Sequence, residues 1–135
     1  MELEPWKNVF RNVIAPALTR EELETLYNGL ARADSAILQG GVCLPAPYHV
    51  NMRKRLTACD PILYGPWKCG RIKNVEDALQ LTDSVSIEAD MTIGVPGALN
   101  LFFEWWDKTP REAAVNALAA EVSLMVADRK GVVVA

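Results

Sequence analysis

A chain of 135 residues has the usual length of one domain, and half of its residues are hydrophobic, which is enough for a single packed core. We therefore expect one domain over residues 1–135. The charged fraction of 23% is ordinary and argues against intrinsic disorder. A net charge of −3 and an isoelectric point near 5.2 argue against a broad nucleic-acid-binding surface, which needs a basic face.

The sequence carries no visible targeting or membrane signal. Residues 1–4 are acidic, whereas a secretory signal begins with a positive segment and continues as an apolar run. No stretch approaches the roughly 20 apolar residues of a membrane span. Three cysteines, an odd number, indicate reduced thiols. We therefore expect a cytoplasmic protein with no membrane partner.

Two helices are predicted before residue 40. Apolar residues recur at helical spacing over 5–15, and Pro16 is expected to end that helix because it lacks a backbone donor. Thr19 and Glu22 then match a capping box, in which the hydroxyl and the carboxylate bind free amides at a helix start. The apolar face of this second helix reaches Ile37, and a pair of glycines follows as its stop.

Residues 42–70 are the irregular part of the chain and contain four prolines. Within this part we expect a short helix over 48–59 and a short strand over 67–72. Asn74 is expected to cap a brief helix that follows, because its side chain can bind the free amides of a first turn.

Apolar and polar residues alternate between residues 85 and 95. This period of two is typical of a strand with one buried and one exposed face. We expect Val85, Ile87, Met91 and Ile93 to be buried and the polar residues between them to be exposed.

Two more helices and a strand are predicted for the C-terminal part. A dense apolar helix is expected over 99–106, and another over 110–129. Thr109 and Glu112 match a second capping box at the start of the latter helix. Residues 132–134 are expected to form a last strand that could pair with the strand at 85–95.

Together these elements predict an α+β fold, a mostly helical single domain with a small sheet around residues 85–95. The alternative is an all-α domain, because Glu88, Ala89 and Asp90 are poor strand formers.

The three cysteines and the single histidine all fall within residues 43–69, as Cys43, His49, Cys59 and Cys69. Three thiolates and an imidazole are sufficient for a tetrahedral zinc site, and a cysteine beside a histidine could act as a nucleophile. However, no two of these residues have the close spacing typical of structural zinc sites. We therefore interpret the cysteines as packed thiols and expect no disulfide and no metal.

Two groups of charged residues are further candidates. Glu88 and Asp90 would share one face of the predicted strand and could bind a divalent cation, but we favour a solvated sheet face as their explanation. Basic residues at 53–55 and 68–73 lie near Trp67, a combination that could bind single-stranded nucleic acid. The acidic total argues against nucleic acid as a partner.

The last two predicted helices offer more hydrophobic surface than a domain of this size readily hides. The helix over 99–106 is apolar nearly all round, and the next helix carries a second face of small residues. Tryptophan is also common at interaction hot spots. We therefore predict a homodimer whose interface includes Leu101, Trp105, Trp106, Ala117 and Leu124.

These observations predict a small cytoplasmic accessory or protein-interaction domain that acts as a homo-oligomer without a cofactor. The alternative is a small enzyme or ligand-binding domain that uses the segment from Cys43 to Cys69. The sequence contains no nucleophile elbow and no glycine-rich phosphate loop, so it assigns no catalytic residue and leaves enzyme activity open.

Overall fold

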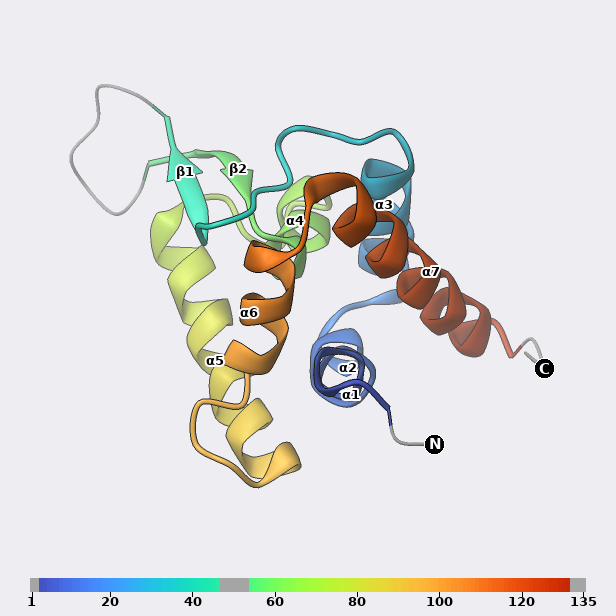
Figure 1. Ribbon diagram of the computed structural model, residues 1–135. Coiled ribbons are helices and arrows are strands. Elements are labelled where there is room, and N and C mark those ends of the chain that lie inside the picture. The colour runs from blue at the N-terminus through green and yellow to red at the C-terminus, as the bar shows by residue number, and fades with distance from the viewer. Residues whose placement is uncertain (1–2, 47–53, 132–135) are drawn as a thin grey trace.

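The computed structural model describes residues 3–46 and 54–131 of the chain (Figure 1). Helices dominate this part, and a small antiparallel sheet accompanies them. In chain order the elements are α1 (Pro5–Val9), the π-helical turn η1 (Phe10–Ile14), α2 (Ala15–Ala17), α3 (Arg20–Ala31), β1 (Cys43–Pro45), β2 (Leu56–Cys59), α4 (Pro61–Lys68), α5 (Val75–Ile93), α6 (Asn100–Lys108) and α7 (Arg111–Arg129).

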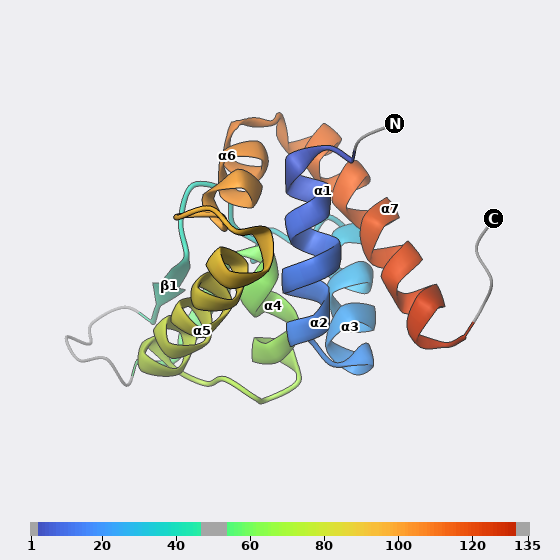
Figure 2. The ribbon, with the colours of Figure 1, turned by 90° about the horizontal axis from the view of Figure 1, so that it is seen from below.

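The N-terminal helix, made of α1, η1 and α2, lies between two groups of helices. Figure 2 shows α3 and α7 on one side of it and α5 and α6 on the other, and α4 packs against both α3 and α5. The core lies where these helices meet. Its largest fully buried side chains include Phe10, Leu26, Tyr64, Phe102 and Trp106.

The first two predicted helices are confirmed, but Pro16 does not end the first one, which continues through α2 to Ala17. The capping box is present, because the Glu22 amide donates to Thr19 Oγ1 (3.1 Å) and the Thr19 amide donates to Glu22 Oε1 (2.9 Å). Helix α3 ends at Ala31, earlier than predicted. Ile37 therefore lies beyond the helix, where it is 1% exposed and forms a bridge with Cys59.

The sheet lies elsewhere in the chain than predicted. Strands β1 and β2 pair antiparallel, with Cys43 opposite Cys59 and Leu44 opposite Ala58. Residues 56–59 are thus a strand where the sequence predicted the end of a helix, and residues 47–53 lie outside the described part. The strand predicted over 67–72 is also wrong, since helix α4 continues through Lys68.

The predicted strand over residues 85–95 is wrong, because α5 runs unbroken from Val75 to Ile93. Asn74 caps this helix as expected, and its Oδ1 accepts from the Asp77 amide at 2.8 Å. The buried positions are Ala78, Val85 and Ala89, which share one face of a helix. The alternating apolar and polar residues over 85–93 therefore lie on a helix, and not all of its apolar side chains face the core.

The sheet is formed by other residues than predicted, but the fold class is the predicted one. The protein is a mostly helical α+β domain, as predicted, with β1 and β2 as its sheet. The predicted helices α6 and α7 are confirmed. The capping box predicted for α7 is absent, because Thr109 Oγ1 instead donates to the Trp105 carbonyl and no side chain caps the helix start. The predicted strand over 132–134 lies outside the described residues.

Helices α3 and α4 cross at two glycines. A Cβ atom added to Gly29 would lie 2.5 Å from the Tyr64 ring, and one added to Gly65 would collide with the backbone carbonyl of Glu22. Only hydrogen atoms at these positions allow the two helices to approach this closely. No helix within the described residues is long and apolar enough to span a membrane.

Replacing Gly65 by alanine is expected to destabilise the protein by about 2 kcal/mol or more, because the carbonyl that it meets belongs to a helix backbone and cannot rotate away. In an unstrained helix the same change would stabilise by about 1 kcal/mol. Urea denaturation measures the difference. Gly41→Ala is the matched control, since no atom lies within 4 Å of the added Cβ. Equal stability of Gly65→Ala and wild type would contradict the close crossing.

Helix α4 begins at Asp60, whose carboxylate is fully enclosed. Its Oδ1 accepts from the amides of Ile62 (2.8 Å) and Leu63 (3.0 Å), whereas its Oδ2 has no hydrogen-bond partner among the described residues. Burial raises the pKa of Asp60 to about 7, although the two amide donors act in the opposite direction. The folded protein therefore holds a proton here that the unfolded chain releases above its usual pKa of 3.8.

The free energy of unfolding is accordingly expected to fall as the pH rises from about 4 to about 7, by up to about 4 kcal/mol from this group. Asp60→Asn keeps an oxygen for the helix cap but cannot ionise, so its unfolding free energy should vary less over this range. Urea denaturation at several pH values tests this, with the exposed Asp83→Asn as control. The expectation fails if Asp60→Asn retains the wild-type pH dependence.

Candidate functional site

The structure brings together only part of the predicted cysteine and histidine set. Cys43 and Cys59 face each other across the two strands, whereas Cys69 lies beyond the other end of α4 and contacts Thr25 Oγ1 at 3.4 Å. His49 lies outside the described residues. Within the described ranges, no three His, Cys, Asp or Glu side chains are grouped so that they could hold a metal ion.

The two facing cysteines are thiols in an environment that disfavours the thiolate. Burial, followed by the nearby Asp60 carboxylate, raises the pKa of both Cys43 and Cys59. Cys59 is completely buried and Cys43 is half-buried. Since the thiolate is the reactive form of cysteine, these surroundings do not support the alternative of a nucleophilic cysteine at either position.

Glu88 and Asp90 do not form the predicted pair on one face. In helix α5 residues two apart point in widely different directions, so the two carboxylates diverge. Glu88 is exposed, whereas Asp90 Oδ1 accepts from the amide of Ala98 at 3.0 Å and anchors the loop after the helix. The strand that would have placed both carboxylates on one face, as candidate ligands of a divalent cation, is therefore absent.

The aromatic residues of the predicted interface mostly contribute to the core. Trp106 is fully buried, and its indole nitrogen donates to the Leu38 carbonyl at 2.6 Å, so it has no surface left for a partner. Trp105 is half-buried and stacks on Trp6, with 3.5 Å between ring centroids. The other predicted interface residues, Leu101, Ala117 and Leu124, are half-buried. Much of the apolar surface that suggested an interface is thus ordinary core packing.

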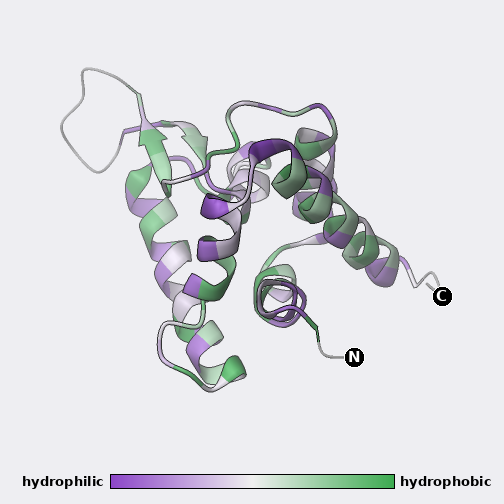
Figure 3. Cartoon of the chain, viewed as in Figure 1, coloured by the Kyte–Doolittle hydropathy of each residue, from purple (hydrophilic) through white to green (hydrophobic). Residues whose placement is uncertain are grey.

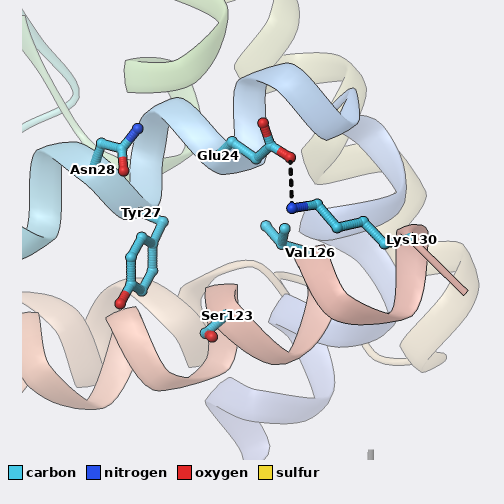
Figure 4. Close-up of a pocket in the computed structure, with 6 residues that line it drawn as sticks. All are labelled: Glu24, Tyr27, Asn28, Ser123, Val126 and Lys130. Carbon is cyan, nitrogen blue, oxygen red and sulfur yellow. Dashed lines mark ion pairs between the residues drawn. The ribbon is translucent and has the colours of Figure 1, made fainter. Parts of the chain in front are cut away.

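A polar groove lies between α3 and α7 (Figure 4). Its volume is about 330 Å³, and the Glu24–Lys130 ion pair (3.5 Å) bridges the two helices at one end. The Tyr27 side chain extends from α3 toward α7, and Ser123 and Val126 of α7 line the opposite wall of the groove. Glu24 also binds Arg20 at 3.0 Å. The carboxylate in this groove is therefore already neutralised by cations of the same chain.

The strongest candidate surface lies on α5, at an edge of the molecule (Figure 1). Ile87 and Met91 are 61% and 74% exposed, and Val95, just after the helix, is 46% exposed. Ile87 and Met91 are four apart, so they lie on one side of the helix, and Val95 follows the left-handed Gly94 that ends it. We call Ile87, Met91 and Val95 the α5 face. Figure 3 shows hydrophobic segments reaching the C-terminal end of this helix.

Carboxylates of α5 lie beside the α5 face. Helix α5 contains no lysine or arginine. It contains five carboxylates, at Glu76, Asp77, Asp83, Glu88 and Asp90. Asp83 and Glu88 are exposed, and Asp83 lies one turn before Ile87 on the same side. The surface therefore combines exposed apolar side chains with a negative border.

This surface was not predicted, because the alternation over residues 85–95 indicated a strand for the same apolar residues. The spacing of four between Ile87, Met91 and Val95 was the available signal, since in a helix it places residues on the opposite side from Val85 and Ala89.

Comparisons with protein-family models, with curated protein sequences and with solved structures find no match to this chain.

Proposed function

We propose that this domain is a protein-interaction module that binds a partner through the α5 face. The observation that carries the proposal is the exposure of Ile87 and Met91, two large apolar side chains one helical turn apart. Exposed apolar patches with polar borders are typical of protein-binding surfaces. The partner segment would present apolar side chains that lysine or arginine residues flank.

The acidic border supports a basic partner over two other occupants. A lipid surface with anionic headgroups would repel the carboxylates of α5. A second copy of the same helix would place two acidic helices side by side, and like charges at an interface oppose association. A basic amphipathic helix instead complements both the apolar side chains and the charge.

The homodimer predicted from α6 and α7 remains a separate proposal. Because Trp106 is enclosed, such a dimer would have to use the half-buried Leu101, Trp105, Ala117 or Leu124. We also propose a reducing compartment such as the cytoplasm, which the three free cysteines support.

The α5 face is tested with a synthetic amphipathic peptide of about five helical turns that carries leucines on one side and lysines beside them. We expect it to bind the protein more tightly than a matched peptide in which glutamates replace the lysines. Ile87→Glu and Met91→Glu should each weaken binding by about tenfold or more, as loss of a central apolar contact does. Asp83→Lys should weaken binding of the lysine peptide by removing a complementary charge. Isothermal titration calorimetry measures these five affinities.

Leu44→Glu is the matched control, because Leu44 is 51% exposed but lies on β1, which Figure 1 shows beside the start of α5 and not beside its C-terminal end. This variant should bind the lysine peptide as wild type does. Equal binding of the lysine and glutamate peptides would contradict the proposal. So would a Leu44→Glu variant that loses as much affinity as Ile87→Glu.

The homodimer is tested by light scattering of the wild type and of Trp105→Ala. A dimer should have twice the 14.9 kDa mass of the chain, and Trp105→Ala should shift it toward monomer. A wild-type mass of one chain at concentrations far above a micromolar dissociation constant would exclude the dimer.

A further inference from the structure

A second hollow lies beside the chain segment that leads into α5. Its volume is about 530 Å³. It is lined by Arg55, Leu56, Trp67, Gly70, Ile72 and Lys73. These residues come from the start of β2, the end of α4 and the segment between α4 and α5. The hollow thus depends on the tertiary structure, since residues 55 and 73 are far apart in the sequence.

Backbone hydrogen bonds fix the two basic residues of this hollow next to each other. The Leu56 amide donates to the Lys73 carbonyl (3.4 Å), and the Val75 amide donates to the Lys54 carbonyl (3.1 Å). Between these bonds Arg55 and Asn74 form an antiparallel bridge. Arg55 and Lys73 are therefore held on neighbouring segments, with exposed side chains that line one hollow.

Among the described residues, neither Arg55 nor Lys73 has a side-chain carboxylate within ion-pair distance, and the same holds for Lys68 on α4. Arg71, by contrast, binds Glu22 at 2.9 Å. Lys68 lies over the Trp67 ring, 4.1 Å from its centroid, and adds a third positive charge beside the hollow. The charged side chains that line the hollow are therefore both cations, although the protein as a whole is negative and the Asp77 carboxylate accepts from the Lys73 amide at 2.9 Å.

The inner part of the hollow is apolar. Leu56 and Ile72 are 5% and 4% exposed, and the indole of Trp67 is half-buried. An aromatic side chain beside unpaired cations suits a ligand that has both a flat ring and a negative group. The volume lies within the range of about 300–1,000 Å³ that is typical of small-molecule sites.

We propose that this hollow binds a small anionic molecule with a planar ring, of the nucleoside monophosphate class. Arg55 and Lys73 contact the phosphate, and Trp67, Leu56 and Ile72 contact the base. The hollow shares no residue with the α5 face. Failure of the proposed interaction through the α5 face would therefore not contradict ligand binding in the hollow.

The probes are adenosine monophosphate, adenosine and inorganic phosphate, titrated against the whole chain by calorimetry. Adenosine monophosphate should bind about tenfold or more tightly than either of its two parts, because only it uses both the cations and the apolar wall. Its affinity should fall as the salt concentration rises. Arg55→Ala and Lys73→Ala should each weaken binding by about fivefold to tenfold, and Trp67→Leu should weaken the binding of adenosine as well as that of adenosine monophosphate.

Lys108→Ala is the matched control, because its side chain is 77% exposed on α6, away from the hollow. It should leave the affinity for adenosine monophosphate unchanged. The proposal is overturned if adenosine monophosphate does not bind at millimolar concentration, or if Arg55→Ala and Lys73→Ala bind it as wild type does. A four-nucleotide single strand that binds more than about tenfold tighter than the mononucleotide would instead assign the hollow to one unit of a nucleic acid and overturn the free nucleotide as its ligand.

Discussion

The close crossing of α3 and α4 is the contact on which the rest of the structure depends. Gly65 lies against the Glu22 carbonyl, and Gly29 lies against the Tyr64 ring. Moving either helix away from the other would therefore open the core. Tyr64 is fully buried, and its hydroxyl donates to Asp34 Oδ2 and accepts from Arg32. Helix α4 is thus fixed at its centre. Its start carries the enclosed Asp60 and its end carries Trp67, so the same contact positions both.

The two surfaces proposed to bind ligands have opposite charge and lie on consecutive parts of the chain. The hollow that includes Arg55 and Lys73 is basic, whereas α5, which begins two residues after Lys73, carries only acidic charges. The overall net charge of −3 conceals this separation. A partner of one charge therefore meets an attractive surface on one side of this segment and a repulsive one on the other.

Enclosure of the aromatic side chains explains why the sequence overestimated the apolar surface of the last two helices. Helix α6 packs against the N-terminal helix, so Trp105 stacks on Trp6 and Phe102 meets Phe10 edge-on. Trp106 projects from a different side of α6, and its indole nitrogen donates to the Leu38 carbonyl in the loop after α3. Two adjacent indoles are both accommodated because the N-terminal helix covers one side of α6 and the loop after α3 covers another. A single-helix pattern contains no information about such coverage.

Local chemistry in the sequence determined where most helices begin and which broad class the fold has. The Thr19–Glu22 capping box and the Asn74 cap act within one turn, so their residues alone predict them. Tertiary structure decided the rest. Alternation between residues 85 and 95 fits a strand and a helix equally, and only burial of Val85 and Ala89 against the other helices selects the helix. The same choice exposes Ile87 and Met91, and the pairing of distant segments brings Arg55 to Lys73, because contacts between elements are set by packing that no local pattern records.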